Sequence, residues 1–257
     1  MMKIYAFFSA LLLWSNGLIS AADVTNPETG TPSPAFSALI AGQALPKQFR
    51  VVTLPKIAVN RFSLVSDDGQ TVLQVASDNS AGSVALPLTS AAGNSQLLLK
   101  WRWKVSRVLD QADMTAKPAD DFAARVYVFF DVPLASLSLI DRSKIRLARL
   151  LAGADVPTAA LCYVWDNTQR VGHTQWSPYT NRVRMIVLQT GNANVNKWLS
   201  ESRHVAADFR DAFGIDAPAI TGVAIGNDTD NTHERVSTWY GDVALKSPAT
   251  QQSTDAK

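Results

Sequence analysis

The chain has one cysteine, Cys162, among 257 residues. An internal disulfide, or a zinc site built from several thiolates, needs at least two cysteines, so both are excluded. The 24 Lys and Arg residues stand against 22 Asp and Glu residues, which gives a formal net charge of +2. This balance lacks the basic excess typical of domains that bind nucleic acid, so we expect no nucleic-acid partner. Cys162 lies in the apolar run Ala159 to Trp165, which favours a buried structural thiol.

Common catalytic signatures are also missing. The chain has no Gly-x-Ser-x-Gly motif, no phosphate-binding loop ending in Gly-Lys-Ser/Thr and no Gly-x-Gly-x-x-Gly motif. His233-Glu234 begins like the helix motif of a zinc protease, but Ser237 stands where the second histidine is needed. With only His173, His204 and His233 in the chain, a three-histidine zinc site is not favoured either.

The first residues are typical of a secretory signal peptide. Met1 to Lys3 supplies a positive charge, an apolar run reaches Trp14, and Ser20-Ala21-Ala22 precedes Asp23. This order predicts cleavage after Ala22, with an uncleaved anchor as the alternative. No later segment is long enough to span a membrane. We therefore expect a periplasmic or secreted protein.

Composition divides the chain into four parts. Residues 1–22 form the predicted signal peptide, and residues 23–47, with four prolines among polar residues, are predicted to be a flexible linker. Residues 48–246 form one domain, and residues 247–257 are predicted to be a disordered tail. Within the domain, short β-branched and aromatic runs alternate with period two and are separated by turn residues.

These patterns predict an all-β fold with minor helices, a two-sheet jelly-roll-like β-sandwich. Asp67-Asp68-Gly69 predicts a hairpin turn. Ser138 to Leu151 has amphipathic spacing and a capping sequence, which predicts an inserted helix, and Trp198 to Phe213 predicts a strand that runs into helical turns. The expected strands are Phe49–Thr53, Phe62–Val65, Thr71–Ala76, Leu97–Val105, Phe122–Asp131, Ala160–Asp166, Arg182–Thr190, Ile220–Gly226 and Val236–Leu245.

Five short motifs in order resemble a known family. They are Asp120 to Tyr127, Tyr163 to Asn167, Arg203 to Phe209, Asn227 to Thr232 and Trp239 to Asp242. Together they are similar to a family of bacterial exported proteins, the domain-of-unknown-function family 3047. The similarity runs from about Phe49 to Leu245. It implies a single β-rich domain and no settled activity, and it supplies no catalytic residues.

Strand alternation suggests a ligand-binding face. If the strands are neighbours, one sheet face would carry aromatic and charged residues, namely Arg125, Tyr127, Tyr163, Trp165, Arg184, Tyr240 and Asp242. Aromatic rings can stack on the CH faces of sugars while charged groups bind the hydroxyls, so this set indicates carbohydrate binding. The alternative is an ordinary core layer under the inserted helix, with Arg125 paired to an acidic residue inside it.

One acidic loop suggests a metal. Asp228, Asp230 and Glu234 offer carboxylate oxygens at alternating positions, which favours a structural calcium ion as the one cofactor that the sequence suggests. The alternative is an Asx-rich turn whose side chains bond their own backbone.

The interpretation that combines these observations is a non-catalytic binder of an envelope glycan or a similar ligand. Two alternatives remain open. One is a carboxylate-dependent glycan hydrolase, with a pair drawn from Asp121, Asp166, Asp228, Asp230 and Asp242. The other is a structural or protein-binding component of the envelope.

Overall fold

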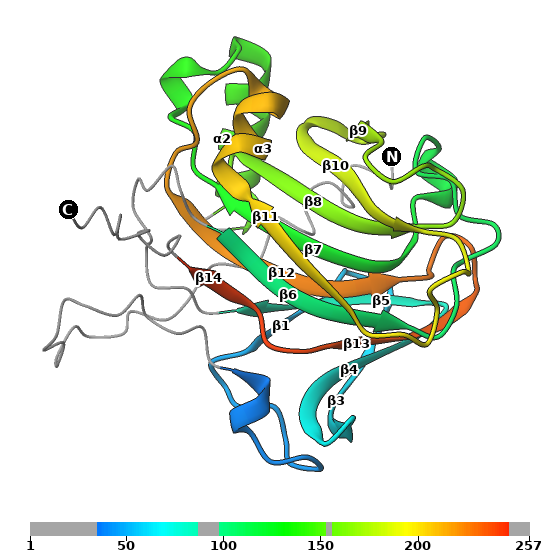
Figure 1. Cartoon of the computed structure of the whole chain (residues 1–257). Coiled ribbons are helices and arrows are strands. Elements are labelled where there is room, and N and C mark those ends of the chain that lie inside the picture. The colour runs from blue at the N-terminus through cyan, green and yellow to red at the C-terminus, as the bar shows by residue number, and fades with distance from the viewer. Residues whose placement is uncertain (1–34, 87–97, 153–155, 247–257) are drawn as a thin grey trace, which may run out of the picture.

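The protein folds as two β-sheets packed face to face, as a computed structural model shows for residues 35–86, 98–152 and 156–246 (Figure 1). The predicted β-sandwich is therefore confirmed. The predicted signal peptide, the first part of the predicted linker and the predicted tail lie outside the described residues. Within those residues, no helix has the length and apolar character needed to cross a membrane.

The larger sheet, sheet A, has eight strands, and sheet B has six. In spatial order sheet A contains β1 (Arg50–Val52), β5 (Ser80–Leu86), β12 (Ile220–Asp228), β7 (Phe122–Phe130), β8 (Ala159–Asp166), β10 (Thr180–Thr190) and β9 (Thr174–Ser177), and β2 (Ala58–Val59) also pairs with β5. Sheet B contains β11 (Leu199–His204), β6 (Leu98–Val105), β13 (Arg235–Tyr240), β4 (Gln70–Asp78) and β3 (Arg61–Asp67), and β14 (Ala244–Lys246) also pairs with β6.

Local signals predicted several of these elements well. Asp68 and Gly69 have positive φ angles of 53° and 73°, as a two-residue turn of type I′ requires, and they join β3 to β4. The strand β5 was not predicted, because its sequence Ser-Ala-Gly-Ser-Val-Ala-Leu has no alternation of polar and apolar residues. It is buried along nearly its whole length, so small residues replace the usual pattern.

The two α-helices of the described residues lie at one end of the sandwich (Figure 1). The helix α2 (Leu139–Ala152) begins as predicted: the Ser138 hydroxyl accepts a hydrogen bond from the Asp141 backbone N–H at 3.1 Å and donates to the Asp141 carboxylate. α3 (Val205–Phe213) directly follows β11, which confirms the predicted strand-to-helix segment. The ring of Phe209 on α3 lies 4.4 Å from that of Phe130, so the helical end is the end where β7 finishes.

Part of the predicted linker is packed against the domain, which corrects that prediction. Phe36, in the short helix η1 (Phe36–Ala38), is 1% exposed and stacks on Phe49 with 5.1 Å between ring centroids. The Ser37 backbone N–H and hydroxyl donate to the Asp242 carboxylate at 2.9 and 2.6 Å. A single large aromatic ring thus anchors a segment whose average composition is polar.

The main core lies between the sheets, and a second apolar layer lies on the outer face of sheet A. Trp101 and Trp103 of β6 pack in the main core against Tyr163 and Trp165 of β8. The outer layer includes Tyr127, Phe129, Cys162, Val164, Met185 and Val187. Cys162 is fully buried, as predicted, and burial raises the pKa of its thiol to about 12.

Candidate functional site

The predicted ligand face is divided between the two sides of sheet A. Arg125 lies opposite Val164 in the β7–β8 ladder, and Tyr127 lies opposite Cys162. Directly opposed residues point to the same face, so Arg125 and Tyr127 share the outer face with these two apolar residues. Tyr163 and Trp165 therefore point inward, where they are 0% and 1% exposed. The expectation of one shared face is wrong because the register between β7 and β8 pairs the outward residues of β7 with Cys162 and Val164, and not with Tyr163 and Trp165.

The other three predicted residues also lie elsewhere. Tyr240 of sheet B points into the main core and is fully buried. Arg184 lies near the edge of sheet A, 4.9 Å from the centre of the Trp176 ring. Asp242 holds Ser37 through the two hydrogen bonds described above. Of the seven predicted residues, Arg125 and Tyr127 remain as candidates for ligand contact.

These two residues line a pocket at the end of sheet A opposite the helices. The pocket is small and partly open, with a cavity volume of about 80 Å³. Its wall comes from β1, β5, the start of β7, the end of β12 and the turn before β10. The lining residues are Val52, Leu54, Ala81, Gly82, Ser83, Asp120, Arg125, Tyr127, Tyr179, Asn227, Asp228, Asp230 and Asn231.

Arg125 holds the pocket together through its guanidinium group. It donates to the Tyr127 hydroxyl at 2.8 Å and to the backbone carbonyl of Asp120 at 2.6 Å. It also forms an ion pair with Asp228, with 2.6 Å between Nη2 and Oδ2. The carboxylate of Asp120 is 3.9 Å from the same nitrogen. Two polar atoms of the pocket residues, Asp120 Oδ1 and Arg125 Nε, are buried with no hydrogen-bond partner.

Asp121 fixes the loop that carries Asp230. Its Oδ2 atom accepts hydrogen bonds from the backbone N–H groups of Asn231 and Thr232 and from the Thr232 hydroxyl, at 2.7 to 3.0 Å. Its Oδ1 atom accepts one bond, from the Asn231 side-chain amide at 3.0 Å. The start of β7 is therefore joined to the loop after β12, although the two are far apart in sequence.

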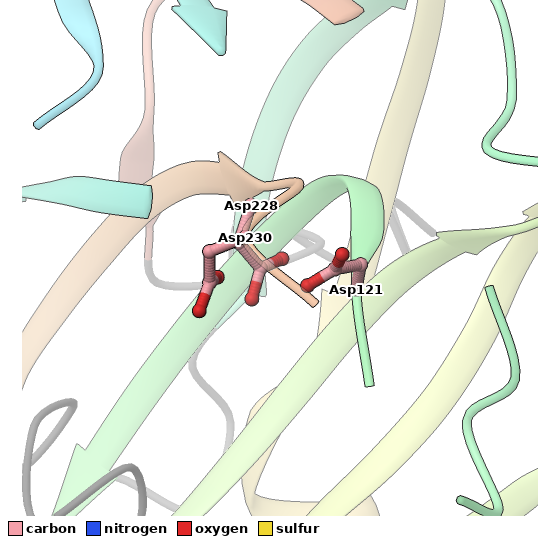
Figure 2. Close-up of side chains that lie close together, drawn as sticks. All are labelled: Asp121, Asp228 and Asp230. Atoms are coloured by element: carbon pink, nitrogen blue, oxygen red, sulfur yellow. The ribbon is translucent and has the colours of Figure 1, made fainter. Parts of the chain in front are cut away.

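The structure brings together only two of the three predicted metal ligands. Asp228 and Asp230 lie close together, and Asp121 joins them so that one carboxylate oxygen from each lies within 4.8 Å of the others. Figure 2 shows these three carboxylates facing one another. Glu234 is not part of the group: it binds Arg107 at 2.7 Å and accepts from the backbone N–H of Gln111. Its placement in a metal site is therefore corrected.

The acidic groups in the pocket hold protons more tightly than usual. Burial raises the pKa of Asp120 to about 6, and the neighbouring Asp121 and Asp230 add to that effect while Arg125 opposes it. Burial also raises the pKa of Asp228 well above its ordinary value despite the ion pair with Arg125. The pKa of Asp230 is raised by burial and by Asp121. The common cause is the crowding of carboxylates in a poorly hydrated space.

Comparison with known proteins identifies a family. A family model described as "Protein of unknown function (DUF3047)" matches residues 47–244. The chain belongs to the DUF3047 family. No match to this DUF3047 chain was found among curated proteins.

Solved structures include two similar to this DUF3047 chain. One is the glycoside hydrolase domain of Endo-D from Streptococcus pneumoniae R6, at 10% identity and a TM-score of 0.35, covering 78% of this chain and 22% of that one. The chain thus spans about a fifth of that protein's length. The other is endoglucanase 3 of family GH12 from Trichoderma harzianum, at 6% identity and a TM-score of 0.37, covering 80% of this chain and 100% of that one.

Sequence reasoning missed Asp120, Tyr179 and Asn231 as members of the DUF3047 pocket. A signal for two of them was present. Asp120 lies in the motif Asp120 to Tyr127, Asn231 lies in the motif Asn227 to Thr232, and the β7–β12 pairing brings these two motifs together. Tyr179 lies outside these motifs, so no signal in the sequence pointed to it. It enters the pocket from a turn, and its hydroxyl donates to the backbone carbonyl of Lys117.

Proposed function

We propose that the pocket binds a small polyhydroxylated unit, such as one sugar residue of an envelope glycan, without catalysing a reaction on it. The observation that carries this proposal is the pair of buried, unpartnered polar atoms in residues that line the pocket, Asp120 Oδ1 and Arg125 Nε. A buried polar group without a partner costs roughly 1 to 3 kcal/mol. A hydroxyl group can donate to a carboxylate and accept from a guanidinium, so a ligand rich in hydroxyls would satisfy both atoms.

The rest of the lining suits the same class of ligand. Val52, Leu54 and the ring of Tyr179 provide apolar surface next to the polar groups. Sugars present both CH faces and hydroxyls, so a mixed wall of this kind fits them. The cavity volume of about 80 Å³ is too small to enclose a long glycan chain. We therefore favour recognition of a glycan end or a small glycan.

Hydrolysis of a glycan is the second candidate function, and one observation favours it. Two carboxylates that line the pocket, those of Asp120 and Asp230, form no hydrogen bond with another side chain among the described residues. A pair of such carboxyls separated by about 5 to 9.5 Å is what glycoside hydrolysis needs. Asp121 and Asp228 are less suited to the reaction, because hydrogen bonds and the ion pair with Arg125 already occupy them.

The location of the protein belongs to the same proposal. The sequence of the first 22 residues supports export, and a glycan of the cell envelope would then be within reach. Intact-mass measurement of the protein recovered outside the cytoplasm should give a chain that begins at Asp23. A full-length product retained in the membrane would contradict export by signal cleavage.

A glycan array probed with the mature protein tests the function, followed by calorimetry on each bound glycan. Arg125→Lys keeps the positive charge next to Asp228 and removes Nε, while Tyr179→Ala removes one wall. Both variants should bind the glycan at least about tenfold more weakly, which corresponds to ~1.4 kcal/mol. The control is Asp216→Asn, because that side chain is 88% exposed and lies outside the pocket.

The three interpretations give different results in these assays. Binding without release of shorter products supports the proposal. Release of reducing ends that is lost in Asp120→Asn and Asp230→Asn would instead support the hydrolase. No binding to any glycan would contradict both and favour a structural or protein-binding role.

A further inference from the structure

The acidic side of the pocket has the geometry of a cation site. Asp121 precedes β7, Asp228 ends β12 and Asp230 lies on the loop that follows (Figure 2). One oxygen from each lies within 4.8 Å of the other two. Oxygen ligands lie about 2.3 to 2.6 Å from Ca²⁺, so two of them on one ion can be at most about 5 Å apart. Two segments that are far apart in the chain therefore present three oxygens at a spacing that one calcium ion can bridge.

A second and independent observation points to a ligand at this place. The side chain of Asp120 is 8% exposed, and its Oδ1 atom has no hydrogen-bond partner. Asp120 lines the same pocket as Asp228 and Asp230, and its carboxylate is repelled by those of Asp121 and Asp230. A metal cation can stabilise a buried carboxylate oxygen that has no donor and lies next to other carboxylates.

The charge count agrees with this assignment. Asp120, Asp121, Asp228 and Asp230 carry four formal negative charges. Among the described residues, Arg125 forms ion pairs with two of them, and the charge of His233 acts on Asp230. Arg125 contacts Asp228 closely, but it is 3.9 Å from Asp120, and it forms no ion pair with Asp121 or Asp230. A divalent cation would offset most of the remaining negative charge.

A free lone pair on Asp121 and the irregular arrangement of the carboxylates favour calcium as the bound ion. Asp121 Oδ1 accepts a single hydrogen bond, so it keeps a lone pair, and the loop bonds on Oδ2 hold the group in position. Calcium accepts six to eight oxygens in irregular geometry, whereas magnesium requires a near-ideal octahedron. Carboxylates that come from a strand start, a strand end and a loop suit the less demanding ion.

We propose that Asp121, Asp228 and Asp230 bind one Ca²⁺ ion on the acidic side of the pocket, that its charge also stabilises the neighbouring carboxylate of Asp120, and that hydroxyl groups of the bound glycan complete its coordination. The last part rests on the proposed function, whereas the first two do not. Hard cations prefer oxygen ligands, and neighbouring sugar hydroxyls can supply two of them. The cation would then connect the protein to its ligand.

The first experiment measures the cation by itself. The mature protein is treated with chelator and then titrated with CaCl₂ in a calorimeter and in a melting assay, at constant ionic strength. We expect saturable binding and a rise in Tm of about 5 to 10 °C at roughly a hundredfold excess over Kd. MgCl₂ should give a smaller shift. A flat calorimetric trace together with an unchanged melting curve at millimolar calcium would overturn the inference.

Substitutions in the pocket test where the ion binds. Asp120→Asn and Asp230→Asn each remove one negative charge from the site without breaking a close ion pair, so both should fold, and each should bind Ca²⁺ at least tenfold more weakly. The control Asp216→Asn should bind calcium as the unsubstituted protein does. Calcium affinity that is unchanged in both pocket variants would place the ion elsewhere and overturn the assignment.

The role of the glycan is tested separately by measuring its binding with calcium and with chelator. Loss of glycan binding in chelator supports coordination by hydroxyls. Equal binding in both conditions would overturn that part of the inference and leave the proposed function intact. Calcium binding by a protein that binds no glycan would support the cation site and contradict the proposed function.

Discussion

The hydroxyl of Tyr240 accepts a hydrogen bond from the backbone N–H of Arg125 at 3.1 Å and donates to the carbonyl of Gly226 at 2.6 Å. Tyr240 belongs to sheet B, whereas its two partners face each other across β7 and β12 of sheet A. The ladder between these strands shifts register directly beside this pair, between Gly226 and Asp228. Tyr240 thus stabilises, from the core side, the β-bulge from which Arg125 and Asp228 enter the pocket.

Tyr240→Phe should destabilise the protein by about 1 to 3 kcal/mol, because it leaves a buried N–H and a buried carbonyl without this partner. Chemical denaturation measures the change. Tyr179→Phe is the matched control, since its hydroxyl donates to the Lys117 carbonyl in an exposed position and its loss should change stability by less than about 0.5 kcal/mol. Equal stability of the two variants would show that the Tyr240 hydroxyl does not hold the bulge.

Trp165→Ala should destabilise the protein by roughly 3 to 5 kcal/mol, because Trp165 is 1% exposed and packs against Trp103 in the main core. Thermal and chemical unfolding measure the loss. Trp176→Ala, a half-buried residue on the edge strand β9, should cost clearly less. If the Trp165→Ala protein instead had normal stability and bound glycan more weakly, Trp165 would belong to a ligand-binding face and not to the core.

Glu201→Gln tests a pH dependence at a half-buried carboxylate of β11 that lies beside Trp103. Burial raises the pKa of Glu201, while hydrogen bonds from Gln189 and Trp103 and the charge of Arg203 oppose that effect. The folded protein therefore binds the Glu201 proton more tightly than the unfolded chain does. The stability that this proton contributes is fully present below the unfolded pKa, near 4.5, and is lost as the pH rises through the folded pKa.

Glutamine keeps the accepting oxygen and does not ionise. The Tm difference between Glu201→Gln and the unsubstituted protein should therefore become more favourable to the variant as the pH rises from about 4 to 7. Melting curves at a series of pH values, recorded in chelator, measure this difference. A difference that stays constant with pH, or moves in the opposite direction, would contradict a raised pKa.

Gly226→Ala should destabilise the protein by about 1 to 3 kcal/mol or more, because a Cβ atom would lie 2.4 Å from the carbonyl oxygen of Gly82 and 2.9 Å from Ser83 Cα. Both are backbone atoms of the neighbouring strand β5, which cannot move without breaking the ladder. Ser83→Ala added to this variant removes a further close contact with the Ser83 hydroxyl and should rescue only a small part of the loss. Full rescue would show that the backbone approach is not limiting.

Features with short-range causes could be predicted from the sequence. The β3–β4 turn depends on two adjacent residues that accept positive φ angles, and α2 begins where a serine and an aspartate three residues apart can bond each other. Most strands followed from alternation. The motifs that carry the family resemblance contain Asp120 and Asn231, which line the pocket, although sequence reasoning assigned neither to a site.

The assignment of faces and of the cation ligands required the tertiary structure. Alternation orders residues within one strand but leaves the phase between strands undetermined, and the register that places Arg125 opposite Val164 sends Trp165 into the core. Likewise, the third carboxylate grouped with Asp228 and Asp230 is not that of Glu234, four residues beyond Asp230, but that of Asp121, directly before β7. Sequence patterns report local geometry, whereas strand pairing over long separations decides which side chains share a site.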